Sequence, residues 1–95
     1  MTAEPEYIEL ARVLGLALEQ AQSGKGKERH ARPGQRLEDQ LIVQLGLELG
    51  SNHYELGQAC KKALESARLP RERAVPELLG AINYLAAAVL VLERS

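Results

Sequence analysis

Residues 81–92 read AINYLAAAVLVL and limit the folds open to this chain more than any other segment. They belong to a helix predicted over about residues 76–94. This run is apolar on nearly every side, and a helix that is apolar all round is buried all round. Three other short helices would cover it only in part, so we expect a second subunit to cover the remainder. The sequence therefore predicts a homo-oligomer, in which Ala86, Ala87 and Ala88 let a partner backbone come close.

The 95-residue chain shows helical periodicity in four segments and no sustained strand alternation. The predicted helices cover about residues 4–22, 37–49, 53–67 and 76–94, with a basic loop over residues 23–36. Gly50 is expected to end the second helix in a left-handed conformation, and Pro76 to begin the last helix. The predicted fold class is all-α, a small four-helix bundle in a single domain over residues 1–95.

The third predicted helix has the clearest start signal. Asn52 is expected to cap it while Glu55, three residues on, reaches back in a capping box. Its apolar positions predict a buried stripe made of Leu56, Ala59, Cys60, Ala63, Leu64 and Ala67. Cys60 is the only cysteine, so no intramolecular disulfide is possible, and we expect it to be a small core residue.

The ends of the chain carry no targeting signal that we can identify. The N-terminal residues MTAEPEYIELARVLG have acids where a secretory signal has basic residues. The most apolar stretch, residues 84–92, is shorter than the roughly 20 residues that cross a bilayer. We therefore expect a cytoplasmic protein with no membrane partner.

The positive charge of this chain is concentrated in one segment, although its net charge is only −1. Residues 24–36 read GKGKERHARPGQR and carry five Lys or Arg residues against one acid, Glu28. Glycines such as Gly24 and Gly26 would let the backbone approach an anion, and arginines would grip phosphate in a bidentate manner. Charge runs are also commonly plain solvated loops, and the sequence leaves both interpretations open.

Two short motifs resemble the all-α nucleotide pyrophosphohydrolases of the MazG type. Residues 61–65 read KKALE and residues 77–80 read ELLG. That family carries E-E-x-x-E on one helix and E-x-x-D at the start of the next, and carboxylates of these motifs hold Mg²⁺ against a nucleotide triphosphate. The resemblance covers about residues 53–92 and implies a MazG-like helical hairpin.

This chain departs from that family pattern at three of the five motif positions that matter most. Glu65 and Glu77 match family carboxylates, whereas the family's other acids fall on Lys61, Lys62 and Gly80. Mg²⁺ is bound through carboxylates and substrate phosphates, so a site stripped this far should not hold a catalytic pair of ions. We expect no metal, no other cofactor and no enzymatic activity.

The segments GKGKERHA, LEDQ, LGQACKKALE and ELLGAINYLAAA together also look like small uncharacterised helical proteins of phages and prophages. That resemblance implies a bacterial host cell in which small proteins disarm host immunity. They do so by blocking an effector or by sequestering a nucleotide signal.

Lysines in place of metal-binding acids could contact phosphate directly. The candidate ligand-binding residues are Lys25, Lys27, Arg29, His30, Arg32, Lys61 and Lys62 for phosphate, Tyr54 as a platform for a base, and Asn83 for a base edge. Several have structural alternatives: Lys61 can pair with Glu65 four residues on, and Asn83 can make a hydrogen bond between helices or subunits.

The favoured hypothesis is non-catalytic sequestration of a phosphate-rich nucleotide, cyclic or signalling, by a phage anti-defence protein. A second hypothesis is a small inhibitor that acts by protein–protein contact on a host defence complex, in the manner of anti-CRISPR proteins. A third is a MazG-like nucleotide pyrophosphohydrolase with a rebuilt metal site. Binding to duplex nucleic acid is not expected, because no helix has basic residues along an exposed face.

Overall fold

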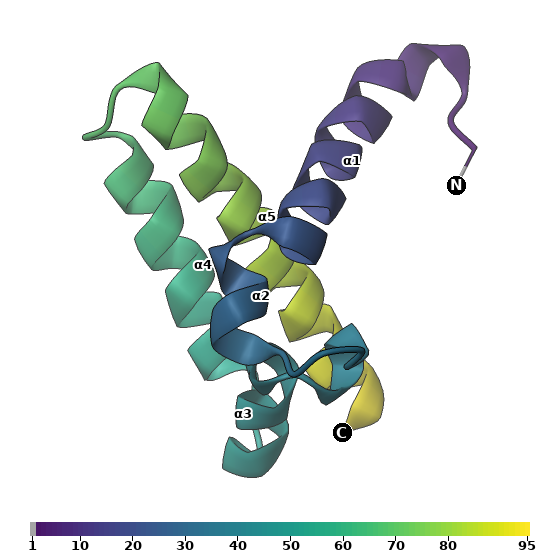
Figure 1. The fold of residues 1–95 in the computed structure, drawn as a ribbon, viewed down its shortest axis with the longest axis vertical. Coiled ribbons are helices and arrows are strands. Elements are labelled where there is room, and N and C mark those ends of the chain that lie inside the picture. The colour runs from purple at the N-terminus through teal and green to yellow at the C-terminus, as the bar shows by residue number, and fades with distance from the viewer. Residues whose placement is uncertain (1) are drawn as a thin grey trace.

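The apolar C-terminal segment forms the longest helix, α5 (Arg71–Arg94), and α4 (His53–Ser66) lies antiparallel beside it (Figure 1). The structure is a computed structural model that describes residues 2–95, without the side chains at positions 25, 26 and 30. Residues 2–95 form helices and connections and contain no strand, so the all-α prediction is confirmed.

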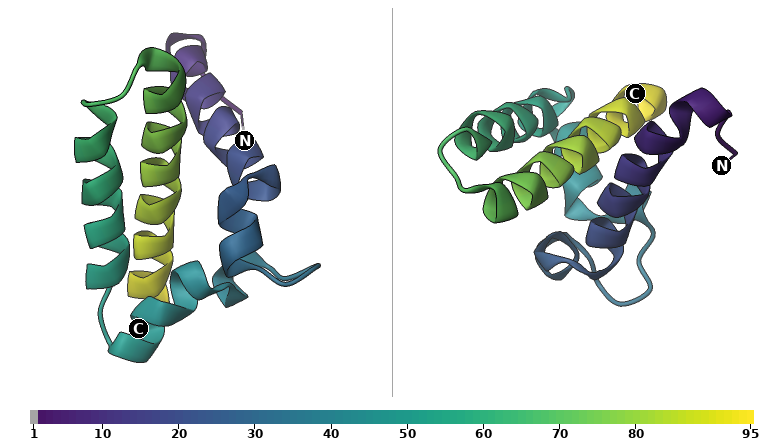
Figure 2. Two further views of the ribbon diagram at one scale, coloured as in Figure 1. Left: turned by 60° about the vertical axis from the view of Figure 1, so that its left-hand side comes forward. Right: turned by 90° about the horizontal axis from the view of Figure 1, so that it is seen from above.

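The remaining helices meet the α4–α5 hairpin from two directions. A short 3-10 turn, η1 (Pro5–Tyr7), leads into α1 (Ile8–Ser23), which begins away from α5 and crosses it with its C-terminal half (Figure 1). The six-residue α2 (Lys25–His30) follows α1. A second 3-10 turn, η2 (Leu37–Asp39), and α3 (Leu41–Leu49) then lie across one end of the hairpin (Figure 2).

The core lies where α3 meets the hairpin, and it is built mostly from small side chains. Its buried members are Ile42, Val43, Ala59, Ala81, Tyr84, Ala87 and Val91. Because the chain has no Phe or Trp, these aliphatic residues and one tyrosine must fill the interior. Small side chains let helices approach closely but remove little apolar surface from water, so the single chain has a modest core.

A buried carboxylate joins α3 to α4. Glu55 is fully buried, and its Oε2 accepts a hydrogen bond from the Gly46 backbone N–H at 3.1 Å. A Cβ atom on residue 46 would lie 2.5 Å from Glu55 Oε1 and 2.7 Å from Val91 Cγ2. Only glycine therefore lets α3 come this close to both helices of the hairpin.

The capping box predicted from Asn52 and Glu55 is wrong. Glu55 is buried against Gly46, and the Asn52 side chain makes no hydrogen bond at the start of α4. Its Nδ2 instead donates to the Ala88 carbonyl of α5 at 3.4 Å. Asn52 and Glu55 thus make hydrogen bonds to other helices instead of the capping bonds to each other's backbone that their spacing predicted.

Two helices begin at residues other than those predicted. α5 begins at Arg71, since Pro70 supplies the extended residue before it, and Pro76 lies inside the helix. The helix predicted over residues 37–49 is divided, because Gln40 is extended with ψ 158° and separates η2 from α3. As predicted, Gly50 ends α3 with φ 73°.

The segment predicted as a basic loop contains α2. Gly24 is extended (φ −89°, ψ −177°) and separates α1 from α2, and its carbonyl accepts a hydrogen bond from the Lys27 N–H at 3.1 Å. Lys, Glu and Arg are good helix formers, which favours one short helix here despite the glycines. The segment therefore presents its side chains from a helical turn.

The stripe of α4 that was predicted to be buried is mostly exposed. Of its members only Ala59 is buried, whereas Leu64 is 75% exposed and Cys60 is exposed. The prediction fails within one chain because α1, α2 and α3 lie against other faces of the hairpin (Figure 2). α5 likewise leaves one side uncovered, where Leu85 is 49% exposed and Leu92 66%.

Among the described residues, α5 has the length and hydropathy of a helix that could cross a membrane. One such helix is weak support for a membrane protein, because the core helix of a soluble protein passes the same test. The compact helical fold, with a radius of gyration of 13.7 Å, suggests a soluble protein.

Replacing Gly46 by alanine should destabilise the fold by about 1–3 kcal/mol, because the new methyl group would overlap Glu55 and Val91. Urea denaturation followed by circular dichroism measures the change. Gly57 is the matched control: it lies within α4, and a Cβ there would meet nothing within 4 Å. Gly57→Ala should stabilise the helix by about 0.5–1 kcal/mol, and equal losses for both variants would contradict the close-approach explanation.

Candidate functional site

A cavity of about 490 Å³ lies between the α4–α5 hairpin and the α1–α2 segment. Four cationic side chains line it: Lys27 and Arg29 of α2, Lys62 of α4 and Arg73 of α5. Two acidic residues, Glu72 and Glu77, and the amides of Gln20, Gln40 and Asn83 also contribute. Aliphatic residues and Tyr84 complete the lining.

The Lys62 side chain extends from α4 toward α5, beside Gly80, Glu77 and Tyr84. A Cβ atom on Gly80 would lie 3.1 Å from Lys62 Cδ and 3.3 Å from its Cε, so the absence of a side chain at residue 80 makes room for the lysine stem. The Lys62 ammonium lies 3.8 Å from Glu77 Oε2 and 6.0 Å from the centroid of the Tyr84 ring. Its side chain is only 24% exposed, so its charge is less screened than that of a surface lysine.

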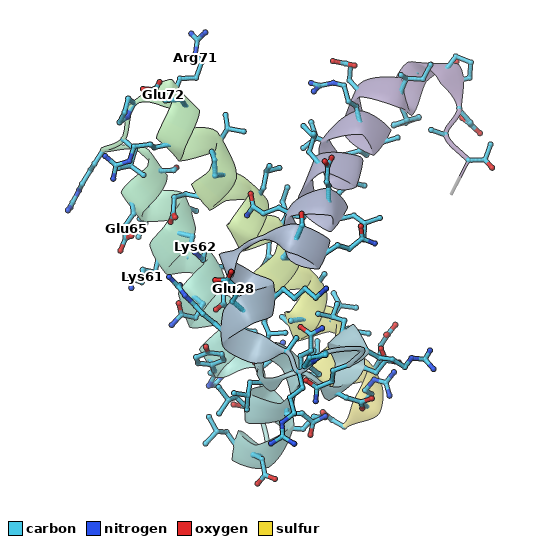
Figure 3. All side chains as sticks on the ribbon, viewed as in Figure 1. Glu28, Lys61, Lys62, Glu65, Arg71 and Glu72 are labelled. Atoms are coloured by element: carbon cyan, nitrogen blue, oxygen red, sulfur yellow. The ribbon has the colours of Figure 1, made fainter. Side chains whose placement is uncertain are left out.

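The adjacent Lys61 points elsewhere. It is 63% exposed, lies 3.9 Å from Glu65 in the expected i,i+4 ion pair, and is absent from the cavity lining. Figure 3 shows Lys61, Lys62 and Glu65 along α4. Successive helical residues are separated by about 100° around the axis, and in α4 this turn places Lys62 at the cavity and Lys61 outside it.

Two tyrosines stand at the boundary between the cavity and the core. Tyr84 is 8% exposed, and the Tyr54 ring packs edge-on against it with centroids 6.1 Å apart. Burial raises the pKa of the Tyr84 phenol; a hydrogen bond with Tyr54 and the nearby charge of Glu55 raise it further, and Arg29 opposes them. Tyr84 is therefore neutral at physiological pH and adds no repulsion toward an anion.

The aromatic surface that lines the cavity belongs to Tyr84, whereas Tyr54, predicted as the platform for a base, supports it from behind. Tyr84 belongs to the apolar run over residues 81–92 that was predicted to be buried, and it is buried. Its second role as part of the cavity wall needed the relative position of α2 and α5, which no local pattern reveals.

Two amide side chains attach α1 to α5 beside the cavity. Asn83 Nδ2 donates to the Ala17 carbonyl at 3.0 Å, and Gln20 Nε2 donates to the Pro76 carbonyl at 3.0 Å. The interhelical hydrogen bond that was one interpretation of Asn83 is thus present, and the same residue also lines the cavity. These bonds hold the α1 wall against the hairpin.

The predicted residues of the basic segment separate into three groups. Lys27 and Arg29 line the cavity. Arg32 is exposed and lies outside the lining, and its backbone N–H donates to Gln35 Oε1 at 2.9 Å. The side chains of Lys25 and His30 lie outside the described part of the structure.

Arg73 and Gln20 line the cavity and were missed by sequence reasoning. Arg73 belongs to residues 68–76, RLPRERAVP. Because Pro76 was predicted to begin the last helix, this segment was predicted to be a connection. The run of charged helix formers after Pro70 was the available signal, since proline is also favoured directly before a helix.

Among the side chains that the structure describes, no three His, Cys, Asp or Glu residues come together as metal ligands would. The two acids that match the MazG pattern lie beside different lysines: Glu65 beside Lys61 and Glu77 beside Lys62. The lining instead combines cations, amide groups and one neutral ring. Such a set suits an anion attached to an organic group.

No protein family matches this chain, and neither a curated protein nor a solved structure is similar to it.

Asn83→Ala should loosen α1 without unfolding the hairpin, at a cost of about 1 kcal/mol for the lost hydrogen bond to Ala17. Hydrogen–deuterium exchange followed by mass spectrometry should show faster exchange in α1 peptides and unchanged exchange in α4. Gln22→Ala is the control: Gln22 is exposed on α1, and its replacement should leave the α1 peptides protected from exchange. Equal exchange in the two variants would mean that the Asn83 bond does not hold the α1 wall.

Proposed function

We propose that this protein captures a phosphate-bearing nucleotide in the cavity between α1–α2 and α4–α5, without converting it. One observation carries the proposal: four cationic side chains from three helices converge on a cavity that has two acidic residues. The local balance is thus +2 (four minus two) in a chain whose net charge is −1. A partly enclosed cavity with excess positive charge concentrates anions.

The chemistry of the lining favours a nucleotide over a bare phosphate ion. A volume of about 490 Å³ lies within the range of about 300–1,000 Å³ typical of small-molecule pockets. Arg29 can hold a phosphate in a bidentate manner, and Lys62 adds a point charge. The Tyr84 ring and the amides of Gln20 and Asn83 offer apolar and hydrogen-bonding contacts for a base.

The position of the acids favours binding over metal-assisted catalysis. Glu77, the acid of the MazG pattern that reaches the cavity, lies 3.8 Å from the Lys62 ammonium. The Lys62 ammonium therefore competes with any metal ion for this carboxylate, and Glu72 is the one other acid among the described residues of the lining. We therefore propose sequestration rather than pyrophosphate release.

The resemblance to small phage proteins supports a setting for this capture. A cyclic or signalling nucleotide held by a homo-oligomeric protein in the cytoplasm of a bacterial host cell would be withdrawn from its receptor. Such a protein would act against host defence. The MazG-like arrangement of α4 and α5 belongs to the same proposal and rests on their motifs.

The first test is to find the ligand. The protein is purified from cells and heated, and released small molecules are identified by liquid chromatography and mass spectrometry. The purified protein is also screened for thermal stabilisation by linear and cyclic nucleotides and by inorganic phosphate. A released nucleotide or a large melting shift supports the proposal, because a ligand stabilises the state that binds it. A protein that contains no nucleotide and is stabilised by none would favour the protein–protein inhibitor instead.

Charge reversal at Lys62 should weaken binding of the nucleotide found in that screen by about tenfold or more, the value of a charge-assisted hydrogen bond. Lys61→Glu is the matched control, since it makes the same change one residue away and outside the cavity. Isothermal titration calorimetry should give an affinity for Lys61→Glu within about twofold of the parent protein. Equal weakening by the two substitutions would contradict a site at Lys62.

Glu77→Gln should strengthen nucleotide binding by a few-fold, because the substitution removes the carboxylate beside Lys62 and leaves its charge available. The same change should alter the free energy of unfolding by less than about 1 kcal/mol, as for other partly exposed ion pairs. Calorimetry and urea denaturation measure the two effects. Glu65→Gln is the control, because Glu65 lies outside the cavity, and it should leave the nucleotide affinity unchanged. If Glu77→Gln alone weakened the affinity, the prediction would be wrong and Glu77 would instead position Lys62 for binding.

A further inference from the structure

We propose that the side of the α4–α5 hairpin facing away from the cavity binds the same side of a second copy of this chain, about a two-fold axis. We call it the open face and define it by Leu56 and Leu64 of α4 and Leu78, Leu85, Val89 and Leu92 of α5. This inference goes beyond nucleotide capture and does not depend on it.

The open face is exposed although its residues are large and apolar. On α5, Leu78 is 44% exposed, Leu85 49% and Val89 54%. On α4, Leu56 is 38% exposed and Leu64 75%. Neither α1 nor α3 covers this side of the hairpin (Figure 2). Contiguous exposed apolar surface of this kind marks an interaction site.

The helical period explains why the face is continuous. On α5, Ala81, Tyr84 and Ala88 are buried, and Asn83 on an adjacent side contacts α1. At about 100° per residue the remaining side carries residues 78, 85, 89 and 92 in one stripe along the helix. On α4, the residues beside buried Ala59 continue that surface, and they include Leu56 and Cys60.

The total surface of the chain shows how large the missing contact is. A folded monomer of 10.4 kDa is expected to expose about 5,400 Å², whereas this chain exposes 6975 Å², an excess of about 1,600 Å². Standard interfaces bury about 800 Å² per partner, and obligate homodimers bury about 1,000–2,500 Å². The excess is spread over the whole chain, including the exposed apolar residues of α1, and it is large enough to include the roughly 800 Å² that one chain contributes to a standard homodimer interface.

The chemistry of the face suits a second copy. Residues 78–92 of α5 include no charged side chain, so a two-fold contact between the two α5 helices would bring no like charges together. A lipid bilayer would need to surround α5, but two of its sides are occupied by the core and by α1.

The oligomeric state is the first test. Native mass spectrometry and light scattering of the parent protein should give twice the chain mass of 10.4 kDa, or a higher even multiple. Leu85→Glu should give smaller species, while Leu18→Glu should not, although Leu18 on α1 is more exposed than Leu85 (58% against 49%). A monomeric parent protein would overturn the proposal, whether or not it binds phosphatidylcholine–phosphatidylglycerol vesicles. If Leu85→Glu and Leu18→Glu both dissociated the oligomer, the proposal would also be overturned.

Cys60 gives a second readout that needs no substitution. Its thiol is exposed in the single chain and lies beside the open face, so association should cover it. Its reaction rate with a thiol reagent should rise by about tenfold when the parent protein is diluted until it dissociates. A rate that does not change with dilution, while the mass falls, would overturn the assignment of this face. Nucleotide binding enters neither measurement.

Discussion

The contact between Glu55 and Gly46 fixes the position of α3, and the rest of the structure depends on that position. α3 supplies Ile42 and Val43 to the core, and Ile42 also forms part of the cavity wall. Glu55 Oε1 has no hydrogen-bond partner among the described residues, and burying such an oxygen costs free energy. We infer that the contact sets where α3 packs, and that the packing of the small core residues offsets its cost.

Local patterns predicted the helical fold well where tertiary contacts agree with them. α4 spans His53–Ser66, close to the predicted residues 53–67, because its apolar spacing and flanking turns are strong. Glu55 was predicted wrongly because a capping box and a buried acid between two helices can have the same local sequence. The start of α5 was predicted wrongly because both Pro70 and Pro76 suit the start of a helix, and the helix begins directly after Pro70.

The candidate site was predictable by residue type and less so by position. Lys27, Arg29 and Lys62 do line one cavity, but Lys61 and Arg32 lie outside it. A sequence cannot say which of two adjacent lysines faces inward until the orientation of the helix is known. The cavity also needs segments distant in the chain to meet, which is why Arg73 went unnoticed.

Lys62 and Gly80 depart from the MazG-type pattern at two positions, and in this structure the two departures touch. The Lys62 stem packs where a side chain on residue 80 would stand, with Cδ 3.1 Å from the position of its Cβ. A side chain at residue 80 would require the flexible lysine stem to shift by a few tenths of an ångström, and an aspartate would bring a further carboxylate near its ammonium. An acid at residue 62 would leave the cavity with as many acids as remaining cations. A glycine at residue 80 and a lysine at residue 62 are therefore compatible with each other in this packing. A cation at residue 62 suits direct contact with an anion, whereas acids at these two positions would suit a metal ion.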